Sequence, residues 1–233
     1  MGDTALIAGM GPGFCESLAW ILARNGYAVG MFARSASYLD DVETELRAEG
    51  HDALAMPTDV TDPESVSAST EEVRSELGPV SALAYTASTV TDDPRDALNP
   101  ERIESLWQLY AMGGLHCFSA VQEDLTTTNG TMLWFGASPT AGDLAYKAGK
   151  GAARGLARGL AERFGPEGVH VAHVIIDGGL RNPDVYEGSG TIDEGDFIDP
   201  DGAAATCFHL IDQPATARTF ELDLHAEKRS SPR

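Results

Sequence analysis

The fold is indicated near the amino terminus by the stretch Ala5-Leu6-Ile7-Ala8-Gly9-Met10-Gly11-Pro12-Gly13, which an amphipathic helical pattern at Phe14–Asn25 follows. Between a strand and a helix, glycines let the backbone turn tightly and approach a pyrophosphate, and the helix presents free N–H groups and a positive dipole end. A glycine-rich string alone also occurs in ordinary turns, but this position favours phosphate binding. We predict that Gly9, Gly11, Gly13 and Phe14 bind a cofactor.

Apolar runs of strand length alternate with helix-period segments along the whole chain. The predicted strands lie at Thr4–Ala8, Tyr27–Ala33, Ala53–Pro57, Val80–Ala87, Thr131–Gly136, Val169–Ile176 and Thr219–Leu224. The predicted helices lie at Phe14–Asn25, Tyr38–Glu49, Pro63–Leu77, Pro100–Leu125, Gly142–Phe164 and Asp201–Ile211. This alternation predicts parallel strands joined by right-handed crossovers. We therefore expect one α/β domain over residues 1–233, with a doubly wound parallel sheet of about seven strands and helices on both faces.

Composition narrows the class of protein. Among 233 residues, 36 Asp and Glu outnumber 16 Lys and Arg, so the formal net charge of −20 disfavours binding to nucleic acid or anionic membrane. No run of about eighteen apolar residues occurs, and the amino terminus lacks the basic region and small-residue cleavage site of a signal peptide.

The chain has an odd number of cysteines, and they are far apart: Cys15, Cys117 and Cys207. This favours a reducing compartment over a disulfide framework or thiolate zinc site. We expect a soluble cytoplasmic protein.

The acidic residues are spread along the whole chain instead of forming one tail. Only three lysines occur, at Lys147, Lys150 and Lys228. This composition resembles proteins of cytoplasms kept at molar salt, where a Debye length of about 3 Å screens like-charge repulsion. An ordinary acidic protein is the alternative.

The predicted second strand ends with Met31-Phe32-Ala33-Arg34-Ser35. At this position an NAD site has a carboxylate for the ribose 2′-hydroxyl, whereas an arginine accommodates the 2′-phosphate of NADP. Arg34 is also compatible with a solvated charge at a strand end, but bases are scarce in this chain. Arg34 and Ser35 therefore predict NADP as the preferred cofactor and NAD as the less favoured one.

The segment Tyr146-Lys147-Ala148-Gly149-Lys150 lies in a predicted helix, where residues four apart share a face. A phenol of ordinary pKa about 10 is a poor acid–base catalyst near neutral pH, and a neighbouring ammonium favours its ionised form. Tyr146 can then exchange a proton with a carbonyl or alcohol while a hydride moves to or from nicotinamide. Two amphipathic residues at a helix edge are the alternative, and the glycine loop favours the catalytic interpretation.

Together these motifs resemble the short-chain dehydrogenase/reductase family over almost the whole chain. Gly9 and Gly13 fit the family's Gly-x-x-x-Gly-x-Gly pattern, with Cys15 at the place of the last glycine. Asp59 and Val60 fit its Asp-Val segment beside the adenine, so we include them among the predicted cofactor-binding residues.

The resemblance also implies a fold, a chemistry and an assembly. The fold is a Rossmann-type sheet, and Tyr146 and Lys150 match the family's catalytic pair. Lys150 would also bind the ribose of the nicotinamide half of the cofactor. The helix Gly142–Phe164, with its many small residues, would pack against its copy in a homodimer or homotetramer.

Several family positions differ in this chain. The usual Asn-Asn-Ala-Gly after the fourth strand is replaced by Tyr85-Thr86-Ala87-Ser88, and the helix asparagine that supports a proton-relay water is replaced by Tyr110. The usual catalytic serine position falls on Ala137. Ser138 follows directly and supplies the missing hydroxyl if the loop shifts by one residue, so we predict Ser138 as the third catalytic residue. We expect these changes to affect turnover more than the fold or cofactor binding.

The segment 182–201 is rich in glycine and acidic residues and contains no Lys or Arg. A loop of this length after a core strand is either a functional lid or disordered, and its place at the carboxyl edge of the sheet favours a substrate lid. Its acids lack the spacing of a calcium loop, and His170 and His173 are three apart on a strand, so we predict no metal site. The aromatic residues Trp107, Tyr110, Trp134 and Phe135 are interpreted as either core or pocket lining.

These observations predict an NADP-preferring oxidoreductase that transfers a hydride between a nicotinamide cofactor and a small or medium carbonyl or alcohol substrate. The alternative is a dinucleotide-binding sensor or scaffold with weakened catalysis. Losses at the asparagine and serine positions support the alternative. Retention of both Tyr146 and Lys150 favours the enzyme.

Overall fold

Among the residues that the computed structural model describes, 3–89, 98–138, 141–180, 195 and 197–227, seven parallel strands form one sheet in the order β3-β2-β1-β4-β5-β6-β9. The strands are β1 (Thr4–Ala8), β2 (Ala28–Ala33), β3 (Ala53–Pro57), β4 (Val80–Tyr85), β5 (Thr131–Ala137), β6 (His170–Asp177) and β9 (Glu221–His225). The chain winds from β1 toward β3, returns to β4 and then winds toward β9. The predicted doubly wound parallel sheet is confirmed.

Register brings the ends of the central strands together. Ala8, the last residue of β1, lies opposite Phe32 of β2 and Tyr85 of β4. The winding direction reverses between β1 and β4, and open α/β sheets bind ligands outside the carboxyl ends of the strands at such a point. The topology therefore locates a binding edge before any side chain is considered.

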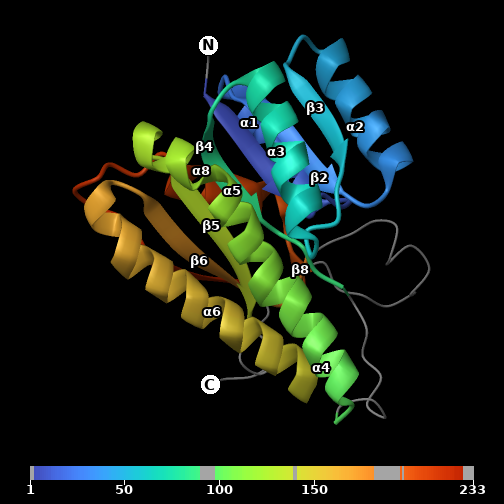
Figure 1. The fold of residues 1–233 in the computed structure, drawn as a ribbon, viewed down its shortest axis with the longest axis vertical. Coiled ribbons are helices and arrows are strands. Elements are labelled where there is room, and N and C mark those ends of the chain that lie inside the picture. Colours follow the sequence, from blue (N-terminus) through green and yellow to red (C-terminus); the bar gives the residue numbers. More distant parts are fainter. Residues whose placement is uncertain (1–2, 90–97, 139–140, 181–194, 196, 228–233) are drawn as a thin grey trace.

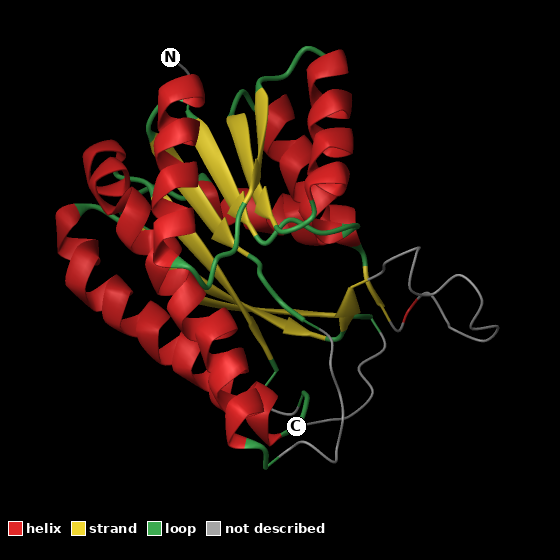
Figure 2. Ribbon diagram, turned by 45° about the vertical axis from the view of Figure 1, so that its right-hand side comes forward, coloured by secondary structure: helices red, strands yellow, loops and turns green. Residues whose placement is uncertain are grey.

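Helices cover both faces of the sheet. One face carries the described helices α1 (Phe14–Arg24), α2 (Ala36–Ala48) and α8 (Pro200–Ile211). The other face carries α3 (Pro63–Leu77), α4 (Pro100–Trp107), α5 (Gly113–Thr128) and α6 (Leu144–Phe164), and a 3₁₀ turn, η3 (Gly165–Glu167), follows α6. In Figure 1 the long helices α5 and α6 cross in front of β5 and β6. Figure 2 shows the strands between the two groups of helices.

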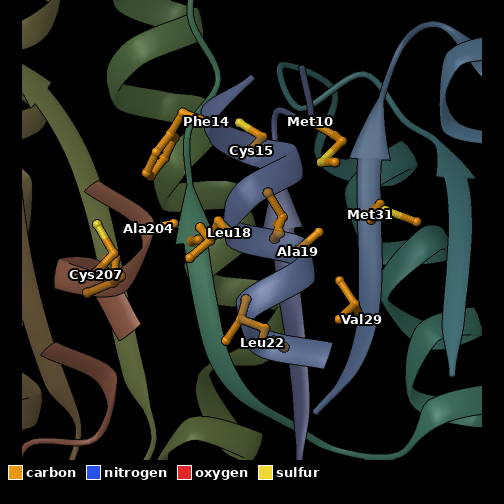
Figure 3. Close-up of a cluster of buried hydrophobic side chains, with 14 of the residues drawn as sticks. Met10, Phe14, Cys15, Leu18, Ala19, Leu22, Val29, Met31, Ala204 and Cys207 are labelled. Carbon is orange, nitrogen blue, oxygen red and sulfur yellow. The ribbon is translucent and has the colours of Figure 1, made fainter. Parts of the chain in front are cut away.

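The core consists of two apolar layers, one on each face of the sheet. Successive residues of β1 alternate between them: Ala5 and Ile7 pack with α1, α2 and α8, whereas Leu6 and Ala8 pack with the helices of the other face. A strand buried on both faces is apolar throughout, as parallel sheets require. Figure 3 shows the first layer, where α1 packs against β2 and α8. In the described part of the chain, no helix is both long and apolar enough to cross a membrane.

The helix predicted at Pro100–Leu125 is interrupted. A π-helical segment, η2 (Gln108–Met112), separates α4 from α5 without a break in the chain direction. Buried side chains bind its carbonyl oxygens from the sheet: the Tyr85 hydroxyl donates to Leu109 O, and the Trp134 indole N–H donates to Tyr110 O at 3.2 Å. The Leu109 and Tyr110 carbonyls thus have partners outside the helix. These partners come from strands distant in the sequence, so helical periodicity alone did not predict the interruption.

A second, two-stranded sheet was not predicted. It pairs β7 (Gly179–Leu180) with β8 (Phe197–Ile198), and two-residue strands are too short to leave a periodic pattern in the sequence. The predicted lid at 182–201 lies mostly outside the described residues. Its final part forms β8 and the start of α8, and the lid function stays a prediction.

Candidate functional site

A cavity of about 470 Å³ lies at the carboxyl edge of the sheet, beside the point where the winding reverses. Its volume falls within the range of about 300–1,000 Å³ typical of small-molecule sites. The loops after β1, β2, β3 and β4 bound it, together with α4 and the start of η2. Its described lining comprises Gly9, Met10, Ala33, Arg34, Ser35, Thr58, Asp59, Val60, Thr61, Ala87, Ser88, Thr89, Ser105, Leu106 and Leu109.

Gly9 allows two of these loops to touch. Its φ is +107°, and a Cβ atom at this position would lie 2.2 Å from the backbone nitrogen of Ala87. The N–H groups of Gly9 and Met10 donate to Phe32 O at 2.9 and 2.8 Å, which ties the loop after β1 to the end of β2. Only glycine combines this backbone conformation with so close an approach.

The remaining glycine-loop residues begin α1. No described atom lies within 4 Å of a Cβ built at Gly11, so the backbone there borders open space. Gly13 precedes the first helical turn, and its N–H donates to the Glu16 carboxylate at 3.0 Å. Phe14 is buried with its ring 5.1 Å from that of Phe135, so its main chain and not its side chain can face a ligand. This arrangement fits a phosphate loop, and the binding roles stay predictions.

Charge in the cavity comes from two side chains. Arg34 is the one cation and Asp59 the one carboxylate among the described lining residues. Hydrogen bonds from the Thr61 hydroxyl and N–H, at 2.7 and 2.9 Å, lower the pKa of Asp59, and the nearby Arg34 charge adds to this. Ser35 and Val60 line the same space. The Asp59 carboxylate is therefore already engaged by Thr61, while the exposed Arg34 guanidinium offers its charge at the end of β2.

The first turn of α6 is held by two contacts of Asp143. Asp143 caps the helix, because its Oδ1 accepts a hydrogen bond from the Tyr146 N–H at 3.0 Å. Its Oδ2 pairs with the Arg102 guanidinium of α4 at 2.7 Å, and both side chains are largely buried. This ion pair links α4 to α6 and holds the turn that carries Tyr146.

Lys150 lies one turn further along α6 and is buried, with 9% of its surface exposed. Its Nζ donates to Phe135 O of β5 at 3.2 Å and lies 4.2 Å from the ring centroid of Tyr110 and 5.8 Å from that of Tyr146. Loss of water around the ammonium lowers the pKa of Lys150 to about 8. At neutral pH the charged form still predominates, so a cation stands beside the Tyr146 ring.

Ser138 follows β5 directly and is buried. Its N–H donates to Ile176 O at 3.2 Å, and its carbonyl oxygen accepts a hydrogen bond from the Ala141 N–H at 2.9 Å. The strand that ends just before Ser138 also supplies the Phe135 carbonyl that accepts a hydrogen bond from Lys150. Tyr146 and Lys150 thus lie together on α6, and Lys150 binds the strand that precedes Ser138. The catalytic role of the Ser138 hydroxyl stays a prediction.

The aromatic residues of uncertain role belong mainly to the core. Tyr110, Trp134 and Phe135 are buried, whereas Trp107 is 39% exposed on α4. Tyr110 lies in η2 and packs on Tyr146 and Lys150 of α6. Its ring centroid is 5.3 Å from that of Tyr146.

The two buried histidines have structural partners. His170 Nε2 lies 2.9 Å from Thr219 O, and His173 Nδ1 lies 3.3 Å from the Glu221 carboxylate. Burial lowers the pKa of both imidazoles. The described residues contain no group of three His, Cys, Asp or Glu side chains arranged to hold a metal ion.

Sequence reasoning missed Arg102 and Asp143. A signal for Asp143 existed, because Asp is a preferred N-cap residue and Tyr146 lies three positions on. Its partner Arg102 is brought close by packing between α4 and α6. No local sequence pattern predicts this packing. The same holds for the cavity residues of α4 and η2, namely Ser105, Leu106 and Leu109.

Comparison with known proteins adds a family match. The family model for short chain dehydrogenases matches residues 3–181. A 2,5-dichloro-2,5-cyclohexadiene-1,4-diol dehydrogenase of Sphingobium indicum is 29% identical over 190 residues, which cover 78% of this chain and 74% of that protein. A 2,3-dihydro-2,3-dihydroxybenzoate dehydrogenase of Bacillus subtilis is 26% identical over 157 residues, which cover 65% of this chain and 60% of that protein.

Solved structures share the fold over nearly the whole chain. An alcohol dehydrogenase from the archaeon Thermococcus sibiricus, complexed with 5-hydroxy-NADP, has a TM-score of 0.85 at 25% identity and is covered over 99% of each chain. L-sorbose reductase from Gluconobacter frateurii, complexed with NADPH and L-sorbose, has a TM-score of 0.87 at 19% identity, with coverage of 99% of this chain and 97% of that one. At that identity the second likeness concerns the fold alone.

Proposed function

The chain belongs to the short-chain dehydrogenase/reductase family, and on that premise we propose that it is an NADP-preferring oxidoreductase. It transfers a hydride between the nicotinamide cofactor and a small or medium carbonyl or alcohol substrate. The observation that carries this proposal is the placement of Tyr146 and the buried Lys150 on one face of α6, where the Lys150 ammonium lies 5.8 Å from the Tyr146 ring.

The residues present fit the cofactor. Gly11 borders open space at the start of α1, where helix N–H groups and the dipole favour a pyrophosphate. The cavity beside it extends past Arg34 and Asp59, which suits the adenosine half of a dinucleotide. The archaeal relative of similar structure is complexed with 5-hydroxy-NADP, which supports the same class of ligand here.

When bound, the cofactor gives or accepts the hydride, and the residues of this chain handle the proton and the charge. Tyr146 donates its phenolic proton to the carbonyl oxygen during reduction, or takes the proton of the alcohol during oxidation. The Lys150 ammonium favours the ionised phenol and so eases this exchange. Ser138 is proposed to donate a hydrogen bond to the oxygen where negative charge develops.

Preference for NADP rests on the end of β2. Arg34 and Ser35 line the cavity there, and Asp59, the one carboxylate among the described lining residues, accepts hydrogen bonds from Thr61. An arginine–phosphate bond contributes about 1.5–3 kcal/mol when shielded, and the exposure of Arg34 places the expected effect at the lower end, about tenfold in affinity.

Two variants test the proposal. Tyr146→Phe retains the ring packing and should lower turnover about a hundred- to ten-thousand-fold with little change in cofactor affinity. Arg34→Ala should weaken NADP binding about tenfold and leave NAD binding unchanged, whereas Arg163→Ala, an exposed arginine at the far end of α6, is the matched control. The measurements are cofactor titration and NADPH oxidation with a panel of aldehydes, ketones and quinones at high salt. Full turnover in Tyr146→Phe, or tighter binding of NAD than of NADP in the unmodified protein, contradicts the assignment.

A dinucleotide-binding sensor or scaffold is the second candidate. It is favoured by Ala137 at the usual serine position and by Tyr110 at the usual asparagine position. Tight NADPH binding combined with no turnover of any carbonyl or alcohol in the panel would support it over the enzyme.

We further propose a homodimer or homotetramer in a salt-rich cytoplasm. Gly151, Gly155 and Gly159 are exposed along α6 with open space at each Cβ position, which would let another helix approach closely. Three buried free cysteines and the net charge of −20 are consistent with a reducing, salt-rich compartment. Light scattering at molar potassium chloride gives the oligomeric state, and a monomeric mass would contradict the assembly.

A further inference from the structure

Tyr110 occupies a special place in the backbone. It lies in the π-helical segment η2, between α4 and α5, where the resemblance implies an asparagine that supports a relay water. Single π-helical turns inside α-helices occur frequently at functional sites. Figure 1 shows α4 and α5 running beside α6, and η2 packs on α6. The Tyr110 side chain therefore faces the helix that carries Tyr146 and Lys150.

The ring of Tyr110 contacts both of these residues. Its centroid lies 5.3 Å from the Tyr146 ring at an interplanar angle of 73°, an edge-to-face packing, and 4.2 Å from Lys150 Nζ. Gly149, between them on the same face of α6, makes room: a Cβ there would lie 2.8 Å from Tyr110 Cδ2 and 2.9 Å from Leu106 O. The surface of α6 is thus shaped to hold an aromatic ring against the lysine.

The polar groups of Tyr110 have protein partners. Its hydroxyl donates to Thr89 O at 3.0 Å, and its carbonyl oxygen accepts the Trp134 indole N–H at 3.2 Å. Both groups are therefore already engaged by protein partners. What Tyr110 offers the buried ammonium is the electron-rich face of its ring, which attracts a desolvated cation.

We propose that Tyr110 is a positioning residue that replaces the water-supporting amide: its ring holds the Lys150 ammonium by a cation–π contact and orients the Tyr146 ring beside it. The catalytic consequence rests on the proposed function, whereas the effect on Lys150 does not. Loss of the ring removes a favourable interaction of the charged lysine and lowers its pKa.

Other groups also act on Lys150. Tyr146 faces it from α6, and the Phe135 carbonyl of β5 accepts a hydrogen bond from it. His173 of β6 is close enough for the Lys150 charge to add to the lowering of the imidazole pKa that burial causes. Beyond His173 lie Glu221 of β9 and Arg154, one turn further along α6, which pair with each other. All of these side chains remain in the chain when Tyr110 alone is substituted, so a change in the pKa of Lys150 reports the loss of the ring together with any displacement of Tyr146 that the loss causes.

The small number of lysines makes the test direct. Lysine labelled with ¹³C at Cε gives signals from three residues in the full chain, and Lys150→Met and Lys147→Met assign the signal of Lys150. In the unmodified protein we expect the Lys150 signal to be displaced upfield by the tyrosine rings. Titration of this signal from about pH 6 to about pH 11 reports the pKa of Lys150 without any substrate. A Lys150 signal at the position of a solvated lysine would overturn the proposal before any variant is made.

Four variants separate a positioning role from ordinary packing. Tyr110→Phe keeps the ring and should leave the signal and pKa of Lys150 close to their original values. Tyr110→Leu should abolish the ring displacement and lower the pKa by about 0.5–1.5 units. Gly149→Ala, which pushes the ring away, should change the Lys150 signal and the pKa of Lys150 in the same directions as Tyr110→Leu does. It replaces Tyr110→Leu in the test if that variant does not fold. Phe118→Leu removes a buried ring of α5 that packs on Phe164, and as the matched control it should change neither.

Turnover provides a second test that is independent of the Lys150 titration. Tyr110→Leu should lower kcat more than it raises KM and should shift the pH profile, and Tyr110→Phe should restore both. An unchanged or higher pKa of Lys150 in Tyr110→Leu, or an equal effect of Phe118→Leu, overturns the proposal. If the pKa responds as expected but no carbonyl or alcohol is turned over, the positioning role stands and the proposed function fails.

Discussion

Replacing Lys150 by methionine should stabilise the folded protein near neutral pH while it impairs catalysis. Folding transfers this lysine from water to a buried site, where its pKa falls from the ordinary 10.5 to about 8. At about 1.4 kcal/mol per pKa unit, keeping the ammonium charged in the folded state costs about 3 kcal/mol at pH 7. Methionine has a similar length and no charge to desolvate, so we expect Lys150→Met to be more stable by up to about 3 kcal/mol at that pH.

The advantage of the variant should depend on pH in a defined direction. Below about pH 8 both the folded and unfolded chains hold the proton, and the cost in the wild type is constant. Between about pH 8 and pH 10.5 the unfolded chain holds more protons than the folded one, so the stability of the wild type rises with pH relative to the variant. The difference should shrink to less than about 1 kcal/mol at pH 10.

Urea unfolding at pH 7, 8, 9 and about 10, at constant high salt, measures this difference. Lys147→Met, at an exposed position of the same helix, is the control and should show no such convergence with the wild type. Parallel pH profiles for the wild type and Lys150→Met would refute the reasoning, because they would mean that the lysine is not desolvated in the folded state.

Two further predictions concern the glycine loop and the surface charge. Gly9→Ala places a Cβ 2.2 Å from Ala87 N at a φ of +107°, so it should lower the free energy of unfolding by about 1–3 kcal/mol. Gly11→Ala adds a Cβ that meets no described atom within 4 Å, so it should leave stability unchanged and weaken cofactor binding. Urea unfolding and cofactor titration measure both, and equal stabilities for the two variants would contradict the assignment of Gly9. Because the net charge is −20, the thermal midpoint should rise with potassium chloride up to molar concentration and respond less to a non-binding osmolyte; a flat salt series would remove the halophilic interpretation.

The regular part of the fold was accessible from the sequence because it depends on local patterns. Continuous apolar runs such as Thr4–Ala8 and Val80–Tyr85 reflect strands buried on both faces, and helical periodicity located α1, α3 and α6 to within a few residues. The order of strand and helix then determined the parallel sheet. The glycine loop could be predicted for the same reason, since it is a short contiguous motif.

Features that depend on contacts between distant segments could not be predicted. The π-helical turn at Gln108–Met112 is accompanied by hydrogen bonds from Tyr85 of β4 and Trp134 of β5, and the sequence of the helix itself continues a helical pattern. The pairing of Arg102 with Asp143 likewise joins residues 41 positions apart in separate helices. Sequence reasoning identified Tyr110 as a departure from the family pattern but gave no account of what it contacts.

The structure shows that two large aromatic side chains, those of Tyr110 and Trp134, pack against glycines. Tyr110 packs where Gly149 has no side chain, and Trp134, which binds the Tyr110 carbonyl, packs where a Cβ at Gly114 would lie 2.3 Å from its indole ring. Each large aromatic residue therefore faces a glycine on a neighbouring helix, where a Cβ atom would overlap its ring.

A chain that had only lost its asparagine would leave a void or an unpaired buried group beside Lys150. Instead, the Lys150 ammonium has a carbonyl acceptor at 3.2 Å and an aromatic face at 4.2 Å. Tyrosine in place of the family's asparagine at position 110 is thus an alternative way to hold the lysine. This difference from the family pattern therefore supports the sensor hypothesis less than the sequence alone suggests. The position that still distinguishes the enzyme from the sensor is Ala137, where the hydroxyl of the neighbouring Ser138 is predicted to replace the missing serine.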